Sequence, residues 1–366
     1  MRVPMKNTES ITLLTPLAIR DVTLPNRIAV SPMCQYSSTE GLANDWHLVH
    51  LGSRAVGGAG TVFVEATAVT REGRISPGDM GLWSDSHIEP LARIARFVDA
   101  NGALPGIQLA HAGRKASTIP PFEGAGPLKS RESGAWETLA PSPIPFDEGY
   151  PAPRALTTGE IETVVSAFAR AAVRAVHAGF RVIELHMAHG YLIHQFLSPF
   201  SNARTDGYGG SLDGRMRLAL EVASRVRGAI PAGMPLFARI SATDWVEGGW
   251  DIEQTVALAV KLKEAGVDLV DCSSGGLLPH AVVPAAPGYQ VPFSVAVRGR
   301  AGILTGAVGL ITEVKQANEI VASGKADIVL LARQMLREPY WGLRAQQEIA
   351  GDIRYPKQYE RARIRR

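Results

Sequence analysis

Short apolar runs recur along the whole chain, and each is followed by a glycine-rich or polar loop and then by an amphipathic stretch. The predicted strands are Arg27–Met33, Thr61–Ala66, Leu104–Ala110, Arg181–Met187, Leu236–Ser241, Leu269–Ser273, Gly302–Gly306 and Ile328–Ala332. Runs that are apolar on both faces are typical of parallel strands covered by helices. About eight such units favour a closed barrel over an open, doubly wound sheet. The sequence therefore predicts an α/β protein built on a (β/α)8 TIM barrel.

The stretches between the predicted strands have the apolar periodicity of helices. The clearest are His87–Ala100, Thr158–Ala178, Leu212–Ala229, Asp251–Ala265 and Ile311–Ala322. We expect one domain over residues 14–350, preceded by a loose end at 1–13 and followed by a tail at 351–366. The segment 117–154 is rich in proline and glycine and follows the third strand. Long irregular segments inside a compact domain are usually functional, so we expect this one to lie over the active site.

Composition and charge narrow the classes of function. Hydrophobic residues make up 46% of the chain and charged residues 20%, which is typical of a globular protein with a large core. The formal net charge of +3 is too small to indicate a nucleic-acid partner, and the apolar runs are too short to span a bilayer. Cys34 and Cys272 lie far apart, so the sequence indicates no disulfide framework and favours a cytoplasmic protein.

In a parallel barrel the carboxyl ends of the strands meet at the active site, so residues at those ends are the candidates. After the first strand the chain turns at a proline, which brings Cys34 and Tyr36 to the barrel mouth. Taken alone, a single cysteine is more often a small residue of the buried apolar core. On the third strand, the amide of Gln108 needs a bonding partner and suits the edge of a heterocycle. Arg114 and Lys115, which follow, are either site cations or part of a solvated loop.

The segment after the fourth strand contains His186 and His189, three residues apart. As metal ligands they would need further partners at metal spacing, which the chain does not offer. The segment also passes from strand to loop, whereas helical zinc motifs need a helix. Structural histidines are a second alternative. We favour a pair of hydrogen-bond donors that polarise one carbonyl oxygen, with Tyr191 as a proton donor.

Two arginines complete the set of candidates. Arg239 lies in the otherwise apolar fifth strand, and a buried guanidinium needs an anionic or polar partner. That partner is either a cofactor or, in a purely structural role, Glu65 or Glu184. Arg333 follows the eighth strand, beside the loop of Gly309 that follows the seventh. Barrels frequently bind phosphate between these two loops, so we expect a phosphate group there.

Five motifs together carry a resemblance to a known family. They are Leu24-Pro25-Asn26-Arg27, Ser31-Pro32-Met33-Cys34-Gln35-Tyr36, Gly106-Ile107-Gln108-Leu109-Ala110-His111-Ala112-Gly113-Arg114-Lys115, His186-Met187-Ala188-His189-Gly190-Tyr191-Leu192 and Ser201-Asn202-Ala203-Arg204-Thr205-Asp206-Gly207-Tyr208-Gly209-Gly210-Ser211. Because they occur in family order over almost the whole chain, the chain resembles the old yellow enzymes, which are also called NADPH dehydrogenases, xenobiotic reductases or ene-reductases. The surroundings of Cys34 and the ending 358–361 resemble the thermophilic-like bacterial branch.

The resemblance implies FMN as cofactor, NADPH or NADH as reductant, and a role for individual residues. The residues implied to bind FMN are Ser31, Pro32, Met33, Cys34, Ala66, Gln108, Arg239, Val308, Gly309, Ala332 and Arg333. Of these, Cys34 would tune the potential of the flavin, and Arg239 would offset the charge of its reduced form. The residues implied to bind substrate or close its pocket are His186, His189, Tyr191 and Tyr36, with Arg361 reaching the site of a neighbouring subunit.

The resemblance also implies a reaction, in which NAD(P)H reduces the C=C bond of small electron-poor alkenes, such as enones and nitro compounds, through FMN. It implies a homodimer or homotetramer and a site without a metal. Two alternatives remain from the residues alone. One is a metal-dependent barrel lyase or hydrolase that uses His186 and His189, and the other is a non-catalytic barrel that binds a phosphate ligand.

Overall fold

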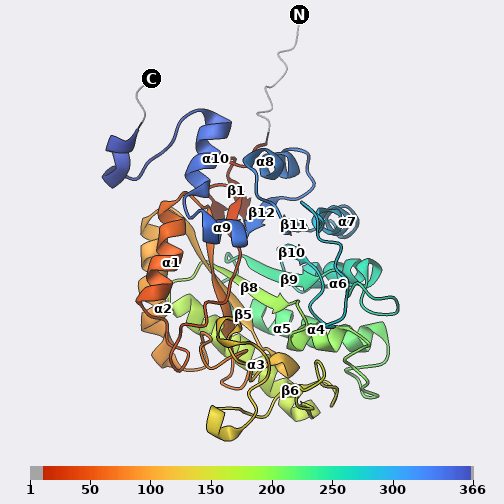
Figure 1. Cartoon of the computed structure of the whole chain (residues 1–366). Helices are drawn as coiled ribbons and strands as arrows, with labels where there is room; N and C mark the ends of the chain where they lie inside the picture. The colour runs from red at the N-terminus through yellow and green to blue at the C-terminus, as the bar shows by residue number, and fades with distance from the viewer. Residues whose placement is uncertain (1–10, 364–366) are drawn as a thin grey trace, which may run out of the picture.

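The computed structural model describes residues 11–363, and its centre is a closed barrel of parallel strands (Figure 1). The barrel strands are β3 (Ile28–Val30), β4 (Thr61–Ala68), β5 (Leu104–Ala110), β8 (Val182–Met187), β9 (Leu236–Ser241), β10 (Leu269–Ser273), β11 (Leu304–Ala307) and β12 (Ile328–Leu331). They are hydrogen-bonded in the order β10-β11-β12-β3-β4-β5-β8-β9, and the ring closes between β9 and β10. Each predicted strand is present, and the predicted (β/α)8 TIM barrel is confirmed.

Helices cover the outside of the barrel. They are α1 (Asp45–Val56), α2 (Ile88–Ala100), α3 (Thr158–His177), α4 (Leu192–Leu197), α5 (Leu212–Ala229), α6 (Ile252–Glu264), α7 (Val291–Ala301), α8 (Val314–Ala322), α9 (Arg333–Arg337) and α10 (Trp341–Ala350). The predicted helices correspond to α2, α3, α5, α6 and α8. Side-chain caps fix several of their starts: Thr157 caps α3 in a reciprocal pair with Glu160, and Asp251 caps α6.

One boundary and several short helices differ from the prediction. Gly302 has φ of 62° and ends α7 in the left-handed conformation, so β11 begins only at Leu304. The sequence does not predict α7 because its buried side chains are few and small, and they form no continuous apolar stripe. They are Ser294, Val297 and Ala301. Helices α1, α4, α9 and α10 are likewise not predicted.

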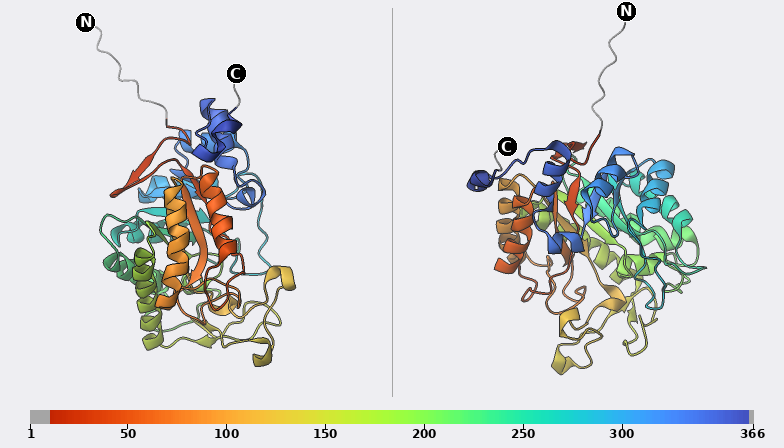
Figure 2. Two further views of the ribbon diagram at one scale, coloured as in Figure 1. Left: turned by 90° about the vertical axis from the view of Figure 1, so that its left-hand side faces the viewer. Right: turned by 45° about the horizontal axis from the view of Figure 1, so that its top comes forward.

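A β-hairpin closes one end of the barrel. Strand β1 (Leu17–Ile19) pairs in antiparallel fashion with β2 (Val22–Leu24), and the buried side chains of the hairpin share an apolar cluster with Phe63 and Phe237 of the barrel. In every view the hairpin and the segment 117–154 lie at opposite ends of the molecule (Figures 1 and 2). The hairpin therefore fills the amino end of the barrel and leaves the carboxyl ends of the strands for a site.

The segment 117–154 packs onto the loops at the carboxyl end of the barrel. Its regular elements are η3 (Pro121–Glu123), η4 (Arg131–Ser133), β6 (Leu139–Ala140) and β7 (Arg154–Ala155), the last beginning at the end of the segment and pairing with β6 in parallel. The indole of Trp136 donates to the carbonyl oxygen of Glu72 at 2.9 Å. The ring of Phe122 meets the ring of Tyr36 edge-on, with centroids 6.2 Å apart. The segment therefore reaches a predicted site residue.

The two ends of the chain can be compared with the prediction only in part, because residues 1–10 and 364–366 lie outside the described residues. Leu13 is buried, and its backbone N–H donates to Asn318 Oδ1 at 2.9 Å. The tail after α10 contains η5 (Lys357–Ala362), and it extends away from the barrel (Figures 1 and 2). No helix that the structure describes is long and apolar enough to cross a membrane.

Candidate active site

Three predicted side chains meet at the carboxyl end of β8. His186 is the penultimate residue of this strand, His189 follows in the loop, and the centroids of the two rings lie 5.1 Å apart with the rings almost perpendicular. The ring of Tyr191 lies 4.9 Å from that of His186, also edge-on. The structure therefore brings together the residues that the sequence singled out in this segment.

Both imidazoles are neutral, and the contacts of His186 assign its ring proton. Burial, followed by the charge of Arg239, holds the pKa of His186 and of His189 well below the usual range. Nδ1 of His186 accepts the N–H of Ala188 at 3.3 Å, which assigns the ring proton to Nε2. Nε2 of His189 lies 2.7 Å from Ser273 Oγ, and either atom of this pair can donate. Two uncharged, neighbouring imidazoles are placed to bind one ligand oxygen.

The turn that carries His189 has an unusual backbone. Its φ is 59° at His189 and 73° at Gly190, and a Cβ at Gly190 would lie 2.2 Å from the carbonyl oxygen of Gly276. Lys115 Nζ donates to the carbonyl oxygens of His189 and Gly276, at 2.9 Å each. Arg114 is buried and also donates to backbone carbonyls. These two cations therefore tie the site loops together, and of the two alternatives left by the sequence the contacts do not favour a solvated loop.

Arg239 is buried in β9 and supplies a cation at the barrel mouth. Its Nε lies 3.0 Å from Asp271 Oδ2 in the neighbouring strand, and its Nη1 donates to Ser31 Oγ at 2.9 Å. The sequence left open a structural salt bridge of Arg239 with Glu65 or Glu184. A salt bridge is present, but its partner is Asp271, so both predicted partners are wrong. The reason is strand register, because β9 and β10 pair Arg239 directly with Asp271.

Gln108 is buried in β5, and its amide is held by a carboxyl group. Nε2 of Gln108 donates to Glu184 Oε1 at 2.7 Å, and the two residues are register partners on neighbouring strands. Burial, followed by the charge of Asp271, raises the pKa of Glu184 to about 8, so this side chain is a carboxylic acid near neutral pH. The bond through Nε2 leaves the amide oxygen of Gln108 available to a ligand.

Replacing Glu184 by glutamine will make the stability of the protein less dependent on pH. A carboxyl whose pKa is raised from 4.5 to about 8 binds its proton more tightly in the native state, so its contribution to stability falls as pH rises through this window. Glutamine imitates the protonated acid. The melting temperature of E184Q relative to wild type should therefore rise between about pH 5 and about pH 8. Thermal unfolding over this range, with the exposed Glu264→Gln as control, measures the effect, and a difference that is constant with pH would contradict it.

The loop after β3 supplies a thiol and a phenol. Burial, followed by the charges of Asp79 and Glu65, raises the pKa of Cys34 well above its usual range, so the thiol stays protonated. The backbone of Ala66, a buried residue of β4, contacts this thiol. Tyr36 has φ of 51°, and burial raises the pKa of its phenol. The predicted cofactor residues of the loop are buried or partly buried, and they are Ser31, Pro32, Met33 and Cys34.

The loops after β11 and β12 lie side by side because these strands are neighbours. Val308 and Gly309 follow β11, whereas Ala332 and Arg333 follow β12. Gly309 has φ of 116°, and a Cβ there would lie 2.7 Å from Gln290 Nε2, so the position requires glycine. These four predicted cofactor residues, among them the ones expected to hold a phosphate, therefore stand on two adjacent loops.

A chain of contacts puts the two predicted arginines on the same rim of the barrel. Arg239 donates to Ser31, the N–H of Ser31 donates to the carbonyl oxygen of Leu331 at 3.0 Å, and Arg333 lies two residues further along. One rim thus carries the guanidinium of Arg239, the amide of Gln108, and the loop of Gly309 beside the guanidinium of Arg333. This donor set fits a planar heterocycle with a phosphate arm, as in FMN.

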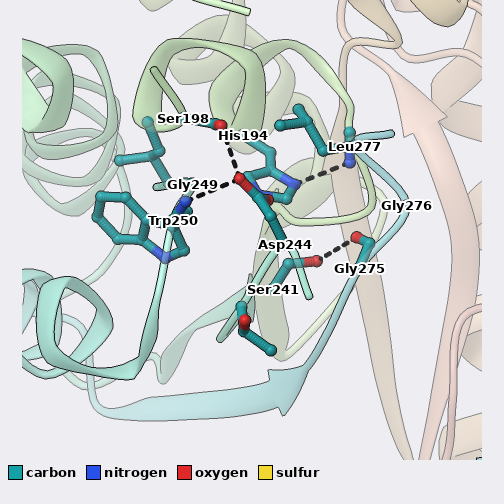
Figure 3. Close-up of polar contacts among 12 residues, drawn as sticks. His194, Ser198, Ser241, Asp244, Gly249, Trp250, Gly275, Gly276 and Leu277 are labelled. Atoms are coloured by element: carbon teal, nitrogen blue, oxygen red, sulfur yellow. Dashed lines mark hydrogen bonds and ion pairs between the residues drawn. The ribbon is translucent and has the colours of Figure 1, made fainter. Parts of the chain in front are cut away.

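Sequence reasoning missed the residues that support this rim. Asp271 and Ser273 lie in a strand whose other residues are apolar or thiol-bearing, and their polarity was the available signal. His194 and Asp244 carry no such signal, and they face each other behind the site, with Nε2 and Oδ1 2.9 Å apart (Figure 3). Arg361 lies exposed in η5. Over residues 11–363 no group of three or more His, Cys, Asp or Glu side chains could hold a metal ion.

Known proteins resemble this chain over nearly its whole length. The model of the NADH:flavin oxidoreductase / NADH oxidase family matches residues 12–352. An NADPH dehydrogenase of Geobacillus sp. (strain WCH70) is 47% identical over 351 residues, which are 95% of this chain and 98% of the relative. An NADPH dehydrogenase of Bacillus subtilis (strain 168) is 46% identical over 351 residues, with the same shares of both chains.

Solved structures share the fold. Morphinone reductase superposes with a TM-score of 0.77 and 25% sequence identity, over 94% of this chain and 91% of that one. A structure of morphinone reductase in complex with tetrahydroNAD has a TM-score of 0.75 and 26% identity, over 95% and 93% of the two chains. The old yellow enzyme homologue from Zymomonas mobilis has a TM-score of 0.77 at 24% identity, over 93% of each chain.

The family match, the relatives and the barrel agree with the five motifs, so the resemblance is confirmed. The chain belongs to the NADH:flavin oxidoreductase / NADH oxidase family, the old yellow enzymes, and it is an FMN-dependent NAD(P)H oxidoreductase.

Proposed function

We propose that the protein is an ene-reductase, which uses NAD(P)H to reduce the C=C bond of α,β-unsaturated carbonyl and nitro compounds. The observation that carries this proposal is the pair of neutral imidazoles, His186 and His189, with centroids 5.1 Å apart on the rim that also carries Arg239. Membership of a flavin oxidoreductase family does not favour the alternative of a metal-dependent lyase or hydrolase that uses these two histidines.

The chain's own residues bind, orient and protonate the alkene. FMN, when bound, takes a hydride from NAD(P)H and passes it to the β-carbon. Nε2–H of His186 and Nδ1–H of His189 donate to the carbonyl or nitro oxygen, which stabilises the negative charge that develops there. Burial raises the pKa of Tyr191 well above its usual range, so the phenol keeps the proton that the α-carbon needs. Tyr36 closes the pocket from the β3 loop.

The proposed cofactor contacts divide between the ring and the phosphate. Gln108, Ala66 and the backbone of 31–34 border the ring, and Cys34, held as a thiol, tunes its potential without acting as a nucleophile. Arg239 offsets the negative charge of the reduced ring. The phosphate is held by Val308, Gly309, Ala332 and Arg333.

The exposed tail supports a further part of the proposal. It extends away from the barrel and carries Arg361, so in a homodimer or homotetramer this guanidinium would reach the site of a neighbouring subunit. We place the protein in the cytoplasm, with small electron-poor alkenes as its ligands and with neither nucleic acid nor membrane as partner.

A spectrum and one assay test the proposal. The purified protein should be yellow, and under anaerobic conditions it should oxidise NADPH in step with the conversion of cyclohexenone to cyclohexanone. Absorbance of the nicotinamide together with chromatography of the ketone measures both sides of the reaction. A yellow protein that oxidises NADPH with oxygen or quinones and leaves a panel of enones and nitroalkenes unchanged would contradict ene-reduction while leaving the family assignment intact.

Replacing Arg333 by alanine will weaken FMN binding about 10- to 100-fold, because one charge-assisted hydrogen bond to phosphate contributes about 1.5–3 kcal/mol. The matched control is Arg337→Ala in the same helix, whose Nη2 donates to Gln334 Oε1 at 2.8 Å. Titration of each apoprotein with FMN, followed by quenching of flavin fluorescence, gives the dissociation constants. Equal constants for R333A and wild type would show that the phosphate lies elsewhere.

A further inference from the structure

A buried histidine stands directly behind the loop of His189. His194 lies in the short helix α4, fully buried, and its Nδ1 accepts the backbone N–H of Gly190 at 2.9 Å. A nitrogen that accepts carries no proton, so the ring proton is assigned to Nε2. That nitrogen lies 2.9 Å from Asp244 Oδ1 (Figure 3). The ring therefore links the peptide beside His189 to a carboxylate of the loop after β9.

Asp244 is held as an anion by three neighbours. Its Oδ2 accepts the hydroxyl of Ser198 at 2.6 Å and the backbone N–H of Trp250 at 2.8 Å, and Figure 3 shows both bonds converging on the carboxylate. Burial alone would raise the pKa of Asp244, but His194 and these two donors hold it below the usual range. An anion fixed in this way keeps the imidazole of His194 in one tautomer and one orientation.

Side chains from three elements form hydrogen bonds with the peptide groups on both sides of His189. The N–H of His189 donates to Ser241 Oγ at 2.9 Å, from β9. Lys115 donates to the carbonyl oxygen of His189. His194 accepts the next N–H along, that of Gly190. Because His189 and Gly190 both have positive φ, this turn is strained, and a strained turn persists only where its surroundings determine it.

We propose that His194, oriented by Asp244, is a positioning residue for His189: by accepting the N–H of Gly190 it fixes the left-handed turn and thereby the direction in which His189 presents its donor to the substrate oxygen. The inference rests on the proposed function, in which His189 binds that oxygen. His194 itself touches neither substrate nor cofactor. The opposing view is that His194 and Asp244 form a buried polar pair that contributes to stability alone.

Two substitutions of His194 separate these views, because each preserves the contact made by one of its two ring nitrogens and removes the contact made by the other. Asparagine places its carbonyl oxygen near the position of Nδ1, so H194N keeps an acceptor for Gly190 and loses the contact with Asp244. Glutamine reaches the position of Nε2, so H194Q keeps the contact with Asp244 and leaves the N–H of Gly190 buried without a partner. The positioning role predicts that ligand affinity follows the Gly190 contact, whereas a structural role predicts that it follows stability.

The experiment titrates FMN-loaded enzyme with 4-hydroxybenzaldehyde and follows the flavin spectrum. We expect the oxygen of this phenol to bind where the substrate oxygen binds. H194N should bind the phenol within about threefold of wild type although its melting temperature falls, since it loses a buried contact. H194Q should bind it about tenfold more weakly, since the N–H of Gly190 loses its acceptor. Its melting temperature should fall less than that of H194N, because the buried Asp244 keeps its contact with residue 194. Native-state exchange of the Gly190 amide hydrogen should be fast in H194Q and slow in H194N.

The outcomes distinguish a failure of the positioning role from a failure of the proposed function. Equal weakening in both variants, or affinity that follows the melting temperature, would overturn the positioning role. If H194N is too unstable to isolate, H194N/D244N removes the buried charge together with its partner, and retained phenol affinity in that variant supports the inference while a tenfold loss overturns it. If wild type binds no phenol, the proposed function fails and the inference with it. If wild type binds and H194Q matches it, the inference alone fails.

Discussion

Replacement of both His186 and His189 by alanine will abolish phenol binding and lower the rate of enone reduction on the order of 10²-fold or more. The two rings supply neutral N–H donors, because burial and the charge of Arg239 hold the pKa of each imidazole well below its usual range. A donor aimed at the oxygen where negative charge develops stabilises the transition state more than the bound substrate. The loss should therefore fall mainly on kcat/KM for the alkene. Stopped-flow reoxidation of pre-reduced enzyme by cyclohexenone measures this step separately.

The reduction by NADPH provides an internal control for the double variant. FMN content should stay near wild type, because the proposed phosphate and ring contacts lie on other strands. The exposed His177→Ala, at the end of α3, should leave both half-reactions unchanged. Near wild-type reoxidation by cyclohexenone in H186A/H189A would refute the assigned role, whereas loss of bound FMN would show that the β8 loop supports the cofactor rather than the substrate.

The strands of this protein were predictable because the strands of a parallel barrel appear in the sequence as short apolar runs. Each strand is buried on both faces and so appears as a mainly apolar run. Leu236–Ser241, which is apolar except for Arg239 and Ser241, has the same bounds in the prediction and in the structure. The error at Gly302 arises where a helix cap and a strand start are only two residues apart. Helix α7 was not predictable by periodicity, because packing between neighbouring elements, rather than an apolar stripe of its own, holds it in place.

The site was predictable to the level of individual strand ends but not to the level of partners. The barrel brings the carboxyl ends of its strands together, so His186, His189 and Arg333 could be grouped without coordinates. The partner of Arg239 depends on register, and Asp271 is directly opposite it on the next strand. The contacts of His194 could not be predicted from the sequence. They depend on which backbone N–H the buried ring reaches in the folded chain, and the sequence does not give that distance.

Replacement of Arg239 by alanine will destabilise the protein by about 3–5 kcal/mol, because it leaves the fully buried Asp271 without its cation. Ser31 loses its donor at the same time. Urea unfolding followed by tryptophan fluorescence measures the change in free energy. The same variant should show a more negative flavin midpoint potential, because the ring gains negative charge on reduction and the offsetting guanidinium is gone.

A double variant separates these two effects of Arg239. In R239M/D271N the buried charge disappears with its partner, so most of the lost stability should return. The midpoint potential should nevertheless stay below that of wild type, because electrostatic interaction falls with distance and only a guanidinium beside the ring offsets its charge strongly. A potential that returns to the wild-type value in the double variant would show that the net charge of the barrel mouth, and not the position of Arg239, sets it. Recovery of stability without recovery of potential would assign Arg239 a role toward the cofactor that its salt bridge with Asp271 does not explain.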